Sequence, residues 1–318
     1  MRLVEPSAAY LPSYQKAFKE YQANQVTTYS FLNPRKVDVL DHICRYREGR
    51  NIPTHHVSST CLWLVEKDEF IGEIWIRHVL TDALLRLGGH IGYGIRFSRW
   101  NQGLGTKMLA MALQYVQENF DFDRVLITCN DDNIGSARII EKNGGVLQDK
   151  IENTLDGRTF LTRRYWVDLN PAYSRCGMRC DLCLIYRPNV EKCDRRSEIC
   201  NVWQKVWPGF QCDPAAVICD GCRSCAEAAV LFSPECKTRR CVMEKGLEHC
   251  GWCSEYPCAS FPAEPTQEEL IQKIEMDRQW TWEDERLMDA YSCKRNMDAF
   301  RLRQACGQME MANDHERF

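Results

Sequence analysis

The sequence has no apolar run long enough to cross a membrane, and no apolar stretch near its first residue is typical of a secretion signal. It also lacks a strong excess of charge of one sign, because 41 Lys and Arg residues nearly balance 44 Asp and Glu residues. These absences disfavour a membrane protein, a secreted protein and a general binder of nucleic acid or anionic lipid. We therefore expect a cytoplasmic protein with neither a membrane nor a nucleic acid as its partner.

Two common nucleotide-binding motifs are missing as well. The chain contains no GxxxxGK[ST] phosphate loop, and its one GxG turn lacks both the third glycine and the later acidic residue of a dinucleotide-binding fingerprint. With 318 residues, the chain is too long for one typical core. We expect two domains and a helical appendage.

Cysteine is scarce in the first half of the chain and abundant in the second. Only Cys44, Cys61 and Cys129 precede residue 170, whereas fourteen of the 19 cysteines fall between Cys176 and Cys258. A shift in composition this sharp marks a domain boundary, and NPAYSR at 170–175 is a plausible linker. This division predicts domains at 1–170 and 171–262.

The rest of the chain, residues 263–318, is predicted to be a helical tail. Thr266 and Glu269 have the spacing of a capping box, in which two side chains satisfy free N–H groups at a helix start. The apolar residues Leu270, Ile271 and Ile274 follow them.

A glycine turn in the first domain separates a strand pattern from a helix pattern. GHIGYGIRF, residues 89–97, alternates apolar residues as a strand does, and the run from Leu104 to Val116 repeats apolar residues at helical spacing. Gly103 and Gly105 therefore lie at a strand-to-helix junction. The first N–H groups of a helix have no partner within it and attract anions. The turn is thus a candidate phosphate site, with an ordinary tight turn as the alternative.

Other elements of the first domain are predicted from the same periodicities. Helices come first in the chain, and a later helix is closed by Gly144 and Gly145. The predicted strands are 61–67, 70–79, 123–129 and 159–169, and the later helix lies within 131–145.

The turn WNQGLG, residues 100–105, resembles the Q/R-x-x-G-x-G/A motif of the GNAT acetyltransferase superfamily, although Trp100 departs from its first position. Asn133, Ser136 and Gly144 resemble that family's N-x-x-A/S segment, and the runs around both motifs are similar to a bacterial and archaeal group of GNAT proteins. The tryptophan also resembles the subgroup of ribosomal-protein N-terminal acetyltransferases. The resemblance covers about residues 1–170. It implies the α/β (α+β) GNAT fold, with a mixed, mainly antiparallel central sheet flanked by helices.

The resemblance further implies acetyl-coenzyme A as the donor, with its pyrophosphate on the N–H groups at the start of the helix. Backbone groups of the strand end would face the acetyl carbonyl and the pantetheine arm, where a fixed N–H stabilises developing negative charge. Asn133 would bind pantetheine, although asparagine also favours a helix N-cap. The expected cofactor-binding residues are Ile95, Phe97, Gln102, Gly103, Leu104, Gly105, Thr106, Asn133 and Ser136.

The catalytic acid and base are less well marked. Many superfamily members carry a tyrosine acid seven residues after the asparagine, where this chain has Ile140. A base must lie within hydrogen-bond reach of the nucleophile, and Glu73, His78, His90 and Tyr93 lie on strands expected to line the acceptor cleft. A packed or solvated side chain is the alternative for each. We expect Glu73, and after it Tyr93, to be catalytic.

Cysteines separated by two residues recur through the second domain. Such gaps let successive thiolates turn toward one metal ion, and tetrahedral zinc needs four ligands. The pattern predicts a small metal-stapled, cysteine-rich domain that binds zinc, with reactive thiols and inert buried thiols as the alternatives. The predicted metal ligands are Cys176, Cys180, Cys183, Cys219, Cys222, Cys225, Cys236, Cys241, Cys250, Cys253 and Cys258.

Two resemblances bear on the metal. Cys176-x3-Cys180-x2-Cys183 is similar to the iron–sulfur triad of radical S-adenosylmethionine enzymes, but Leu182 replaces their usual aromatic residue and too little sequence follows for their barrel. The region from RCGMRCDLC to HCGWCSEYPC resembles a widespread cysteine-rich domain of unknown function that is thought to bind zinc. Zinc is therefore expected, with an iron–sulfur cluster as the second option.

Three functions follow from these patterns. The first is an acetyl-coenzyme A-dependent N-acetyltransferase that acts on an amine acceptor, with a zinc domain that positions the substrate. The second is a regulatory protein that binds acyl-coenzyme A and senses a metal, with Ile140 in place of the usual acid explaining weak or absent catalysis. The third is a redox or iron–sulfur protein with a vestigial acetyltransferase domain.

Overall fold

A computed structural model describes residues 1–155, 157–207, 209–224, 226–261 and 281–314. The chain forms two compact units, Met1–Leu169 together with the part that begins at Leu302, and Asn170–Arg301. The predicted capping box at Thr266 and Glu269, with Leu270, Ile271 and Ile274, lies outside the described residues.

The first unit is built on one mixed, seven-stranded sheet in the order β1-β2-β3-β4-β5-β7-β6. Every neighbouring pair is antiparallel except β4 and β5, which are parallel. The predicted mixed, mainly antiparallel sheet is therefore confirmed. Its strands are β1 (Arg2–Val4), β2 (Ser59–Glu66), β3 (Glu69–Arg77), β4 (Ile91–Ile95), β5 (Arg124–Asn130), β6 (Gly145–Leu155) and β7 (Arg158–Asp168).

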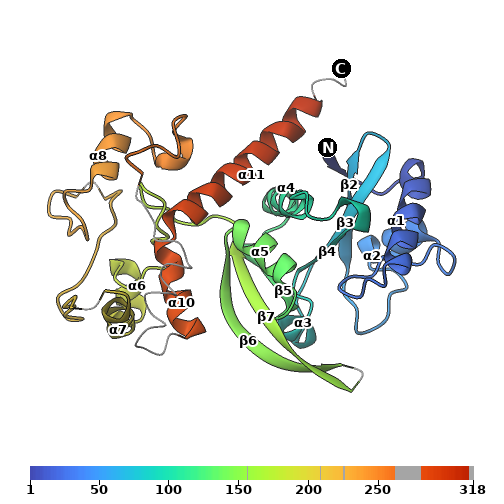
Figure 1. Ribbon diagram of the computed structural model, residues 1–318, viewed down its shortest axis with the longest axis horizontal. Helices are drawn as coiled ribbons and strands as arrows, with labels where there is room; N and C mark the ends of the chain where they lie inside the picture. Colours follow the sequence, from blue (N-terminus) through green and yellow to red (C-terminus); the bar gives the residue numbers. More distant parts are fainter. Residues whose placement is uncertain (156, 208, 225, 262–280, 315–318) are drawn as a thin grey trace. The chain divides into compact units, whose positions relative to one another are not determined.

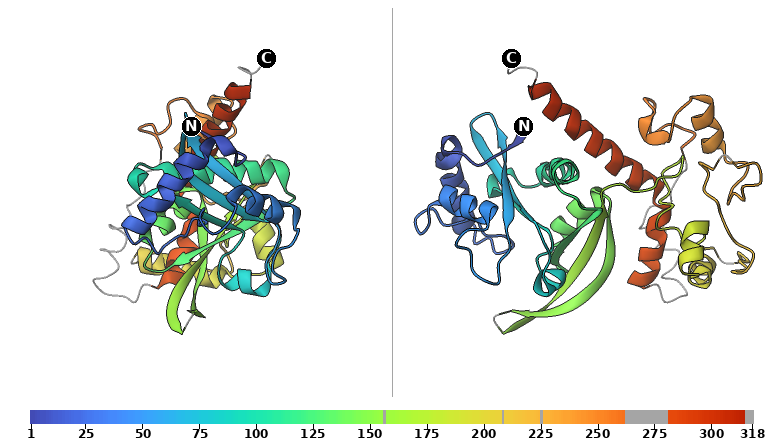
Figure 2. Two further views of the ribbon diagram at one scale, coloured as in Figure 1. Left: turned by 90° about the vertical axis from the view of Figure 1, so that its right-hand side faces the viewer. Right: turned by 180° about the vertical axis from the view of Figure 1, so that it is seen from behind.

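Helices cover both faces of this sheet. Figures 1 and 2 show α1 and α2 on one face and α4 on the other, with α5 beside α4. The helices of the unit are α1 (Leu11–Ala23), α2 (Val39–Glu48), α3 (Asp82–Arg86), α4 (Leu104–Asn119) and α5 (Ile134–Lys142).

The two faces of the sheet enclose separate apolar clusters, and β2 contributes to both. Leu62 and Leu64 pack in the cluster under α4 and α5. Cys61 and Trp63 pack in the cluster under α1 and α2. This alternation follows from the strand period of two residues, and it explains why β2 is apolar along nearly its whole length.

The second unit contains short helices joined by long irregular segments. Its apolar cluster is small and centres on Trp203, which is 1% exposed, with Ile185 and Ile199 beside it. A disulfide joins Cys200 to Cys212, neither of which is a predicted metal ligand. Within the described residues its α-helices are α6 (Arg187–Lys192), α7 (Arg196–Val206), α8 (Lys237–Glu244) and α10 (Trp282–Met288), and α11 (Cys293–Asp314) begins in this unit.

Candidate functional site

The glycine turn leads directly into α4, as the sequence predicts. Gly103 is the N-cap of this 16-residue helix and has φ 71°, a left-handed conformation that side chains disfavour. A Cβ atom placed on Gly103 would meet nothing within 4 Å, so the space beside this backbone is open. A Cβ on Gly105, in contrast, would lie 2.7 Å from Cδ1 of Ile139. Gly103 therefore leaves room for a ligand, whereas Gly105 serves the packing of α4 against α5.

The turn has the features of an anion site. Gln102 and Gly103 are exposed and Thr106 is half-buried. The first N–H groups of α4 belong to Leu104, Gly105 and Thr106, which follow the N-cap Gly103, whereas Gln102 precedes the helix. Leu104 and Gly105 are buried, and Gly105 has no side chain, so these two residues offer a ligand only their backbone. The residues present fit a pyrophosphate held by backbone N–H groups at a helix N-terminus.

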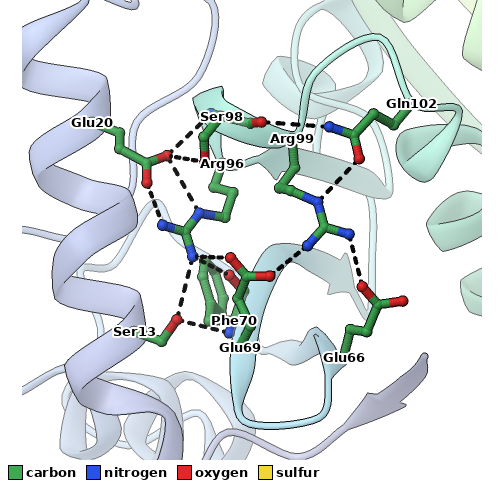
Figure 3. Close-up of polar contacts among 9 residues, drawn as sticks. All are labelled: Ser13, Glu20, Glu66, Glu69, Phe70, Arg96, Ser98, Arg99 and Gln102. Carbon is green, nitrogen blue, oxygen red and sulfur yellow. Dashed lines mark hydrogen bonds and ion pairs between the residues drawn. The ribbon is translucent and has the colours of Figure 1, made fainter.

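A network of arginines and glutamates holds the segment between β4 and the turn (Figure 3). The Arg99 guanidinium donates to Gln102 Oε1 at 3.1 Å and forms ion pairs with Glu66 and Glu69. Glu66 and Glu69 flank the β2–β3 turn. The side chain of the predicted phosphate-turn residue Gln102 is thus linked through Arg99 to the β2–β3 turn.

Arg96 ties the same segment to α1 from within the protein. It is 6% exposed, forms ion pairs with Glu20 and Glu69, and donates to the Phe70 carbonyl at 3.2 Å. Glu20 also accepts from the N–H and the hydroxyl of Ser98. A buried charge is tolerated only when paired in this way, so the conformation of 96–99 is fixed before any ligand binds.

Ile95 lies where β4 ends, and its backbone groups point toward the β5 side. The Arg96 N–H donates to Ile71 O of β3, so the Ile95 N–H, one residue earlier, points away from β3. Its carbonyl accepts from Tyr21 Oη at 2.5 Å and from Trp100 Nε1 at 2.7 Å. For Ile95 the N–H is therefore the group available to a ligand. At Phe97 the carbonyl accepts the Trp100 N–H at 3.1 Å.

The ladder between β4 and β5 is short. The two strands are in register only at Ile91 and Ile127, although β4 continues to Ile95 and β5 to Asn130. Strands β4 and β5 therefore diverge toward the C-terminal end of β4, after which the glycine turn begins. A divergence of this kind leaves strand backbone available to an extended ligand.

The polar residues at the start of α5 bond to one another. Asn133 is the N-cap, and its side-chain oxygen accepts the Ser136 N–H at 3.0 Å. The Ser136 hydroxyl is 2.9 Å from the hydroxyl of Tyr93 on β4. Asn133 thus takes the capping role that was the alternative reading, which leaves its side-chain amide as the group for a cofactor. Ile140 is fully buried in the core.

Glu73 is a buried carboxyl group on β3. It is 1% exposed, and its Oε1 accepts from the Tyr29 hydroxyl at 3.0 Å. Its Oε2 has no hydrogen-bond partner among the described residues. Burial raises the pKa of Glu73 to about 7, opposed first by the bond from Tyr29 and then by the side chains of Trp75 and Trp63. A carboxyl group with one free oxygen and this pKa suits proton transfer near neutral pH.

The two expected catalytic residues lie on opposite faces of the sheet. Tyr93 is paired with Ile74 and packs with the cluster under α4. Glu73 is paired with Gly94 and with Trp63, which belongs to the cluster under α1 and α2. Burial also raises the pKa of Tyr93, so its hydroxyl is a proton donor at neutral pH.

The two histidines among the candidates have local partners. His90 Nδ1 accepts the Leu126 N–H of β5 at 2.9 Å, and burial lowers its pKa to about 4. His78 Nε2 lies 2.9 Å from the Thr60 hydroxyl, and burial lowers its pKa as well. His90 is therefore neutral near pH 7, and its side chain links the start of β4 to β5.

The predicted zinc centre is not formed by the side chains that the structure describes. Among these residues, no group of three or more His, Cys, Asp and Glu side chains is placed to hold a metal ion. Cys225, one predicted ligand, lies outside the described residues. Some described thiols are nevertheless close neighbours: after burial, Cys222, Cys183 and Cys219 all raise the pKa of Cys180. Cys176 Sγ is 3.7 Å from Cys293 Sγ, and Cys222 Sγ accepts the Arg175 N–H at 3.1 Å.

Four of the predicted ligands nevertheless converge. Cys241 of α8 and the later Cys250, Cys253 and Cys258 line one small cavity. Lys245 Nζ donates to Cys253 Sγ at 3.6 Å at the same place. Of the other predicted ligands, Cys183 contacts the Tyr291 hydroxyl and Cys219 Sγ accepts the Gly221 N–H.

The helices that the structure describes include none long and apolar enough to span a membrane.

Two family models match the chain. Residues 2–146 match the acetyltransferase (GNAT) domain, and residues 172–263 match a protein family of unknown function. No curated protein matches the sequence. The chain therefore contains a GNAT acetyltransferase domain followed by a second, fused domain.

Three solved structures that are similar to this chain share little sequence with it. The microcin C7 self-immunity acetyltransferase MccE, in complex with acetyl-CoA and AMP, is 15% identical, with 52% of this chain and 91% of that chain covered and a TM-score of 0.41. An acetyltransferase from Salmonella typhimurium that modifies the N-terminal serine of ribosomal protein L7/L12 is 14% identical, with 53% and 94% covered and a TM-score of 0.41. RimJ from Mycobacterium smegmatis, in complex with a CoA disulfide, is 18% identical, with 52% and 80% covered and a TM-score of 0.41.

Proposed function

We propose that this protein is an acetyl-coenzyme A-dependent acetyltransferase that acetylates an amine. The observation that carries the proposal is the preformed turn at the N-terminus of α4, with open space beside Gly103 and with Gln102 held by Arg99. The GNAT domain at residues 2–146 supports it. A labelling experiment with acetyl-coenzyme A identifies the chemical class of the acceptor.

The roles of the residues follow from their placement. The N–H groups of Gln102–Thr106 hold the pyrophosphate, and the Ile95 N–H donates to the carbonyl that is attacked. Acetyl-coenzyme A, when bound, supplies an acetyl thioester whose transfer leaves a free thiol. We assign to Glu73 Oε2 the proton that the acceptor ammonium loses, because this oxygen has no hydrogen-bond partner among the described residues and the pKa of the carboxyl group is raised to about 7. The Tyr93 hydroxyl is the proton donor on the opposite face, and the amide of Asn133 binds the pantetheine arm.

The first test follows label from radiolabelled acetyl-coenzyme A into fractionated cytosolic protein, RNA and small molecules. The probe variant is Gly103→Val, which strains a residue with φ 71° and fills the open space. Gly157→Val is a matched control, because Gly157 has φ 73° and equally open surroundings. We expect label in one fraction, lost with Gly103→Val and kept with Gly157→Val.

Each other outcome has a definite meaning. Label that persists with Gly103→Val contradicts the phosphate turn. Tight binding of acetyl-coenzyme A without transfer to any fraction contradicts the enzyme and favours the regulatory protein. The fraction that takes the label names the acceptor class.

We also propose that the second unit binds zinc at Cys241, Cys250, Cys253 and Cys258. The support is their convergence on one cavity, together with the two-residue gap between Cys250 and Cys253. Metal content and the visible spectrum of the purified protein test this proposal, with Cys250→Ser/Cys253→Ser compared with Cys44→Ser. A colourless protein that loses zinc only in the double variant supports the site. Visible charge-transfer bands favour an iron–sulfur cluster, and equal zinc in all three proteins contradicts the site.

A further inference from the structure

Glu73 lies in an almost wholly aromatic environment beneath α1 and the segment that follows it. The titratable groups that face it are Tyr14 and Tyr21 of α1, Tyr29 of the α1–α2 segment and Cys61 of β2. From β4 it faces Gly94, which has no side chain. Phenols and a buried thiol are neutral near pH 7, so none of these groups offers the carboxyl group a compensating positive charge.

Tyr29 makes two specific contacts at this place. Its hydroxyl donates to Glu73 Oε1 at 3.0 Å. Its ring lies directly on Gly94, where a Cβ atom would be 2.3 Å from Cδ1 of the tyrosine. Phe31 packs edge-on against the same ring, with ring centroids 5.5 Å apart. The glycine and the phenylalanine therefore fix where the hydroxyl of Tyr29 points.

Within the part of the chain that the structure describes, the second carboxyl oxygen of Glu73 has no well-formed hydrogen bond. Trp63 stands opposite Glu73 in the β2–β3 ladder. The side chains of Trp63 and Trp75 are donors near the carboxyl group and lower its pKa, although the Trp63 N–H has no well-formed hydrogen bond among the described residues. A buried polar atom without a well-formed hydrogen bond costs about 1–3 kcal/mol, so Glu73 Oε2 is expensive to maintain in this position. Such a cost is explained when a bound molecule completes the site.

We infer that Tyr29 is a positioning residue for Glu73, which holds one carboxyl oxygen so that the other faces the acceptor amine. The inference rests on the proposed function and deepens it. The hydroxyl of Tyr29 fixes the rotation of the carboxyl group, and Gly94 gives the tyrosine ring its place. The side chain of Tyr29 does not itself exchange a proton with the substrate.

The bond from Tyr29 also sets the pH at which Glu73 works. A donor to the ionised carboxylate favours that form and lowers the pKa, against burial, which raises it. Removing the hydroxyl raises the pKa further. Since the base must be ionised, the acid limb of the pH profile then moves to higher pH.

The test is the pH profile of kcat/KM for Tyr29→Phe, measured with the acceptor class that takes label. We expect the midpoint of the acid limb to move up by about one pH unit, with activity recovering at high pH. Tyr14→Phe is the matched control, because the Tyr14 hydroxyl donates to the Leu32 carbonyl at 3.3 Å and not to the carboxyl group. For Tyr14→Phe we expect the midpoint of the acid limb to equal that of the unmodified protein.

A second variant, Gly94→Ala, keeps the hydroxyl but displaces the ring. It is expected to lower kcat more than it raises KM, with the fold checked by circular dichroism. An unchanged acid limb in Tyr29→Phe overturns the inference even if the variant is less active. Loss of the acid limb in the unmodified protein, or full activity of Glu73→Gln, overturns the proposed base itself, so the two failures are distinguishable.

Discussion

The indole N–H of Trp100 donates to the carbonyl oxygen of Ile95 at 2.7 Å. This bond joins the first residue of the glycine turn to the last residue of β4. Trp100 stands where the family motif has glutamine or arginine, and its ring is 38% exposed. The tryptophan therefore acts here through its N–H, which fixes the start of the turn against the strand.

Trp100→Phe removes that bond and keeps most of the ring. We expect the affinity for coenzyme A to fall severalfold, because a net hydrogen bond is worth about 1 kcal/mol and the turn is then less well ordered. Isothermal titration calorimetry measures the change. Trp252→Phe, a similarly exposed tryptophan of the second unit, is the control. Equal affinities in the two variants would contradict this role.

Arg99→Met removes the link between the glycine turn and the β2–β3 turn. The variant loses the bond to Gln102 and two ion pairs, so the turn must be ordered when ligand binds. We expect roughly tenfold weaker binding of coenzyme A, with only a small change in Tm. Arg50→Met, which breaks an exposed pair with Glu48, is the matched control. A large loss of Tm with unchanged affinity would show that the network serves stability alone.

Glu73→Gln should stabilise the protein at alkaline pH while abolishing transfer. The pKa of Glu73 is raised to about 7, so its favourable contribution is complete below its unfolded value and is lost as pH rises through about 7. The neutral amide avoids this loss, by as much as about 3 kcal/mol at pH 8. Urea unfolding of both proteins at pH 4.5 and pH 8 measures the difference. A gap that is equal at the two pH values would contradict the raised pKa.

His90→Leu should destabilise the sheet by about 1–3 kcal/mol, because the Leu126 N–H loses its buried acceptor. Chemical unfolding at pH 7 gives the value. Activity per folded molecule is expected to remain, since the lowered pKa and the backbone bond make His90 structural. Loss of turnover without loss of stability would reverse this assignment.

The strands and the central helix of the first unit could be predicted because their apolar periods are clear. The predicted strand at 61–67 corresponds to Ser59–Glu66, and that at 159–169 to Arg158–Asp168. Strand Gly145–Leu155 was missed. Its central residues are polar and mostly half-buried, because it is an edge strand with one neighbour. Without a clear alternation of apolar and polar residues, the sequence does not predict this strand.

The turn and Glu73 could be chosen from the sequence, but their supports could not. Arg96 and Glu20 are 76 residues apart, and Tyr29 and Glu73 are 44 apart. Such pairs are set by the packing of α1 and the following segment against the sheet, which local periodicity does not describe. Tyr29 also stands in a segment without regular structure, where neither a helical nor a strand period singles it out.

The burial of α4 sets how the phosphate turn behaves over time. From Met108 to Leu113 every residue of this helix is nearly or completely buried, so no side of it can loosen without opening the core. Amide protons in this stretch should exchange with deuterium only when the whole unit unfolds. Their exchange rates would then read the global free energy of unfolding directly. The N-terminus of α4 is therefore already ordered before a ligand binds.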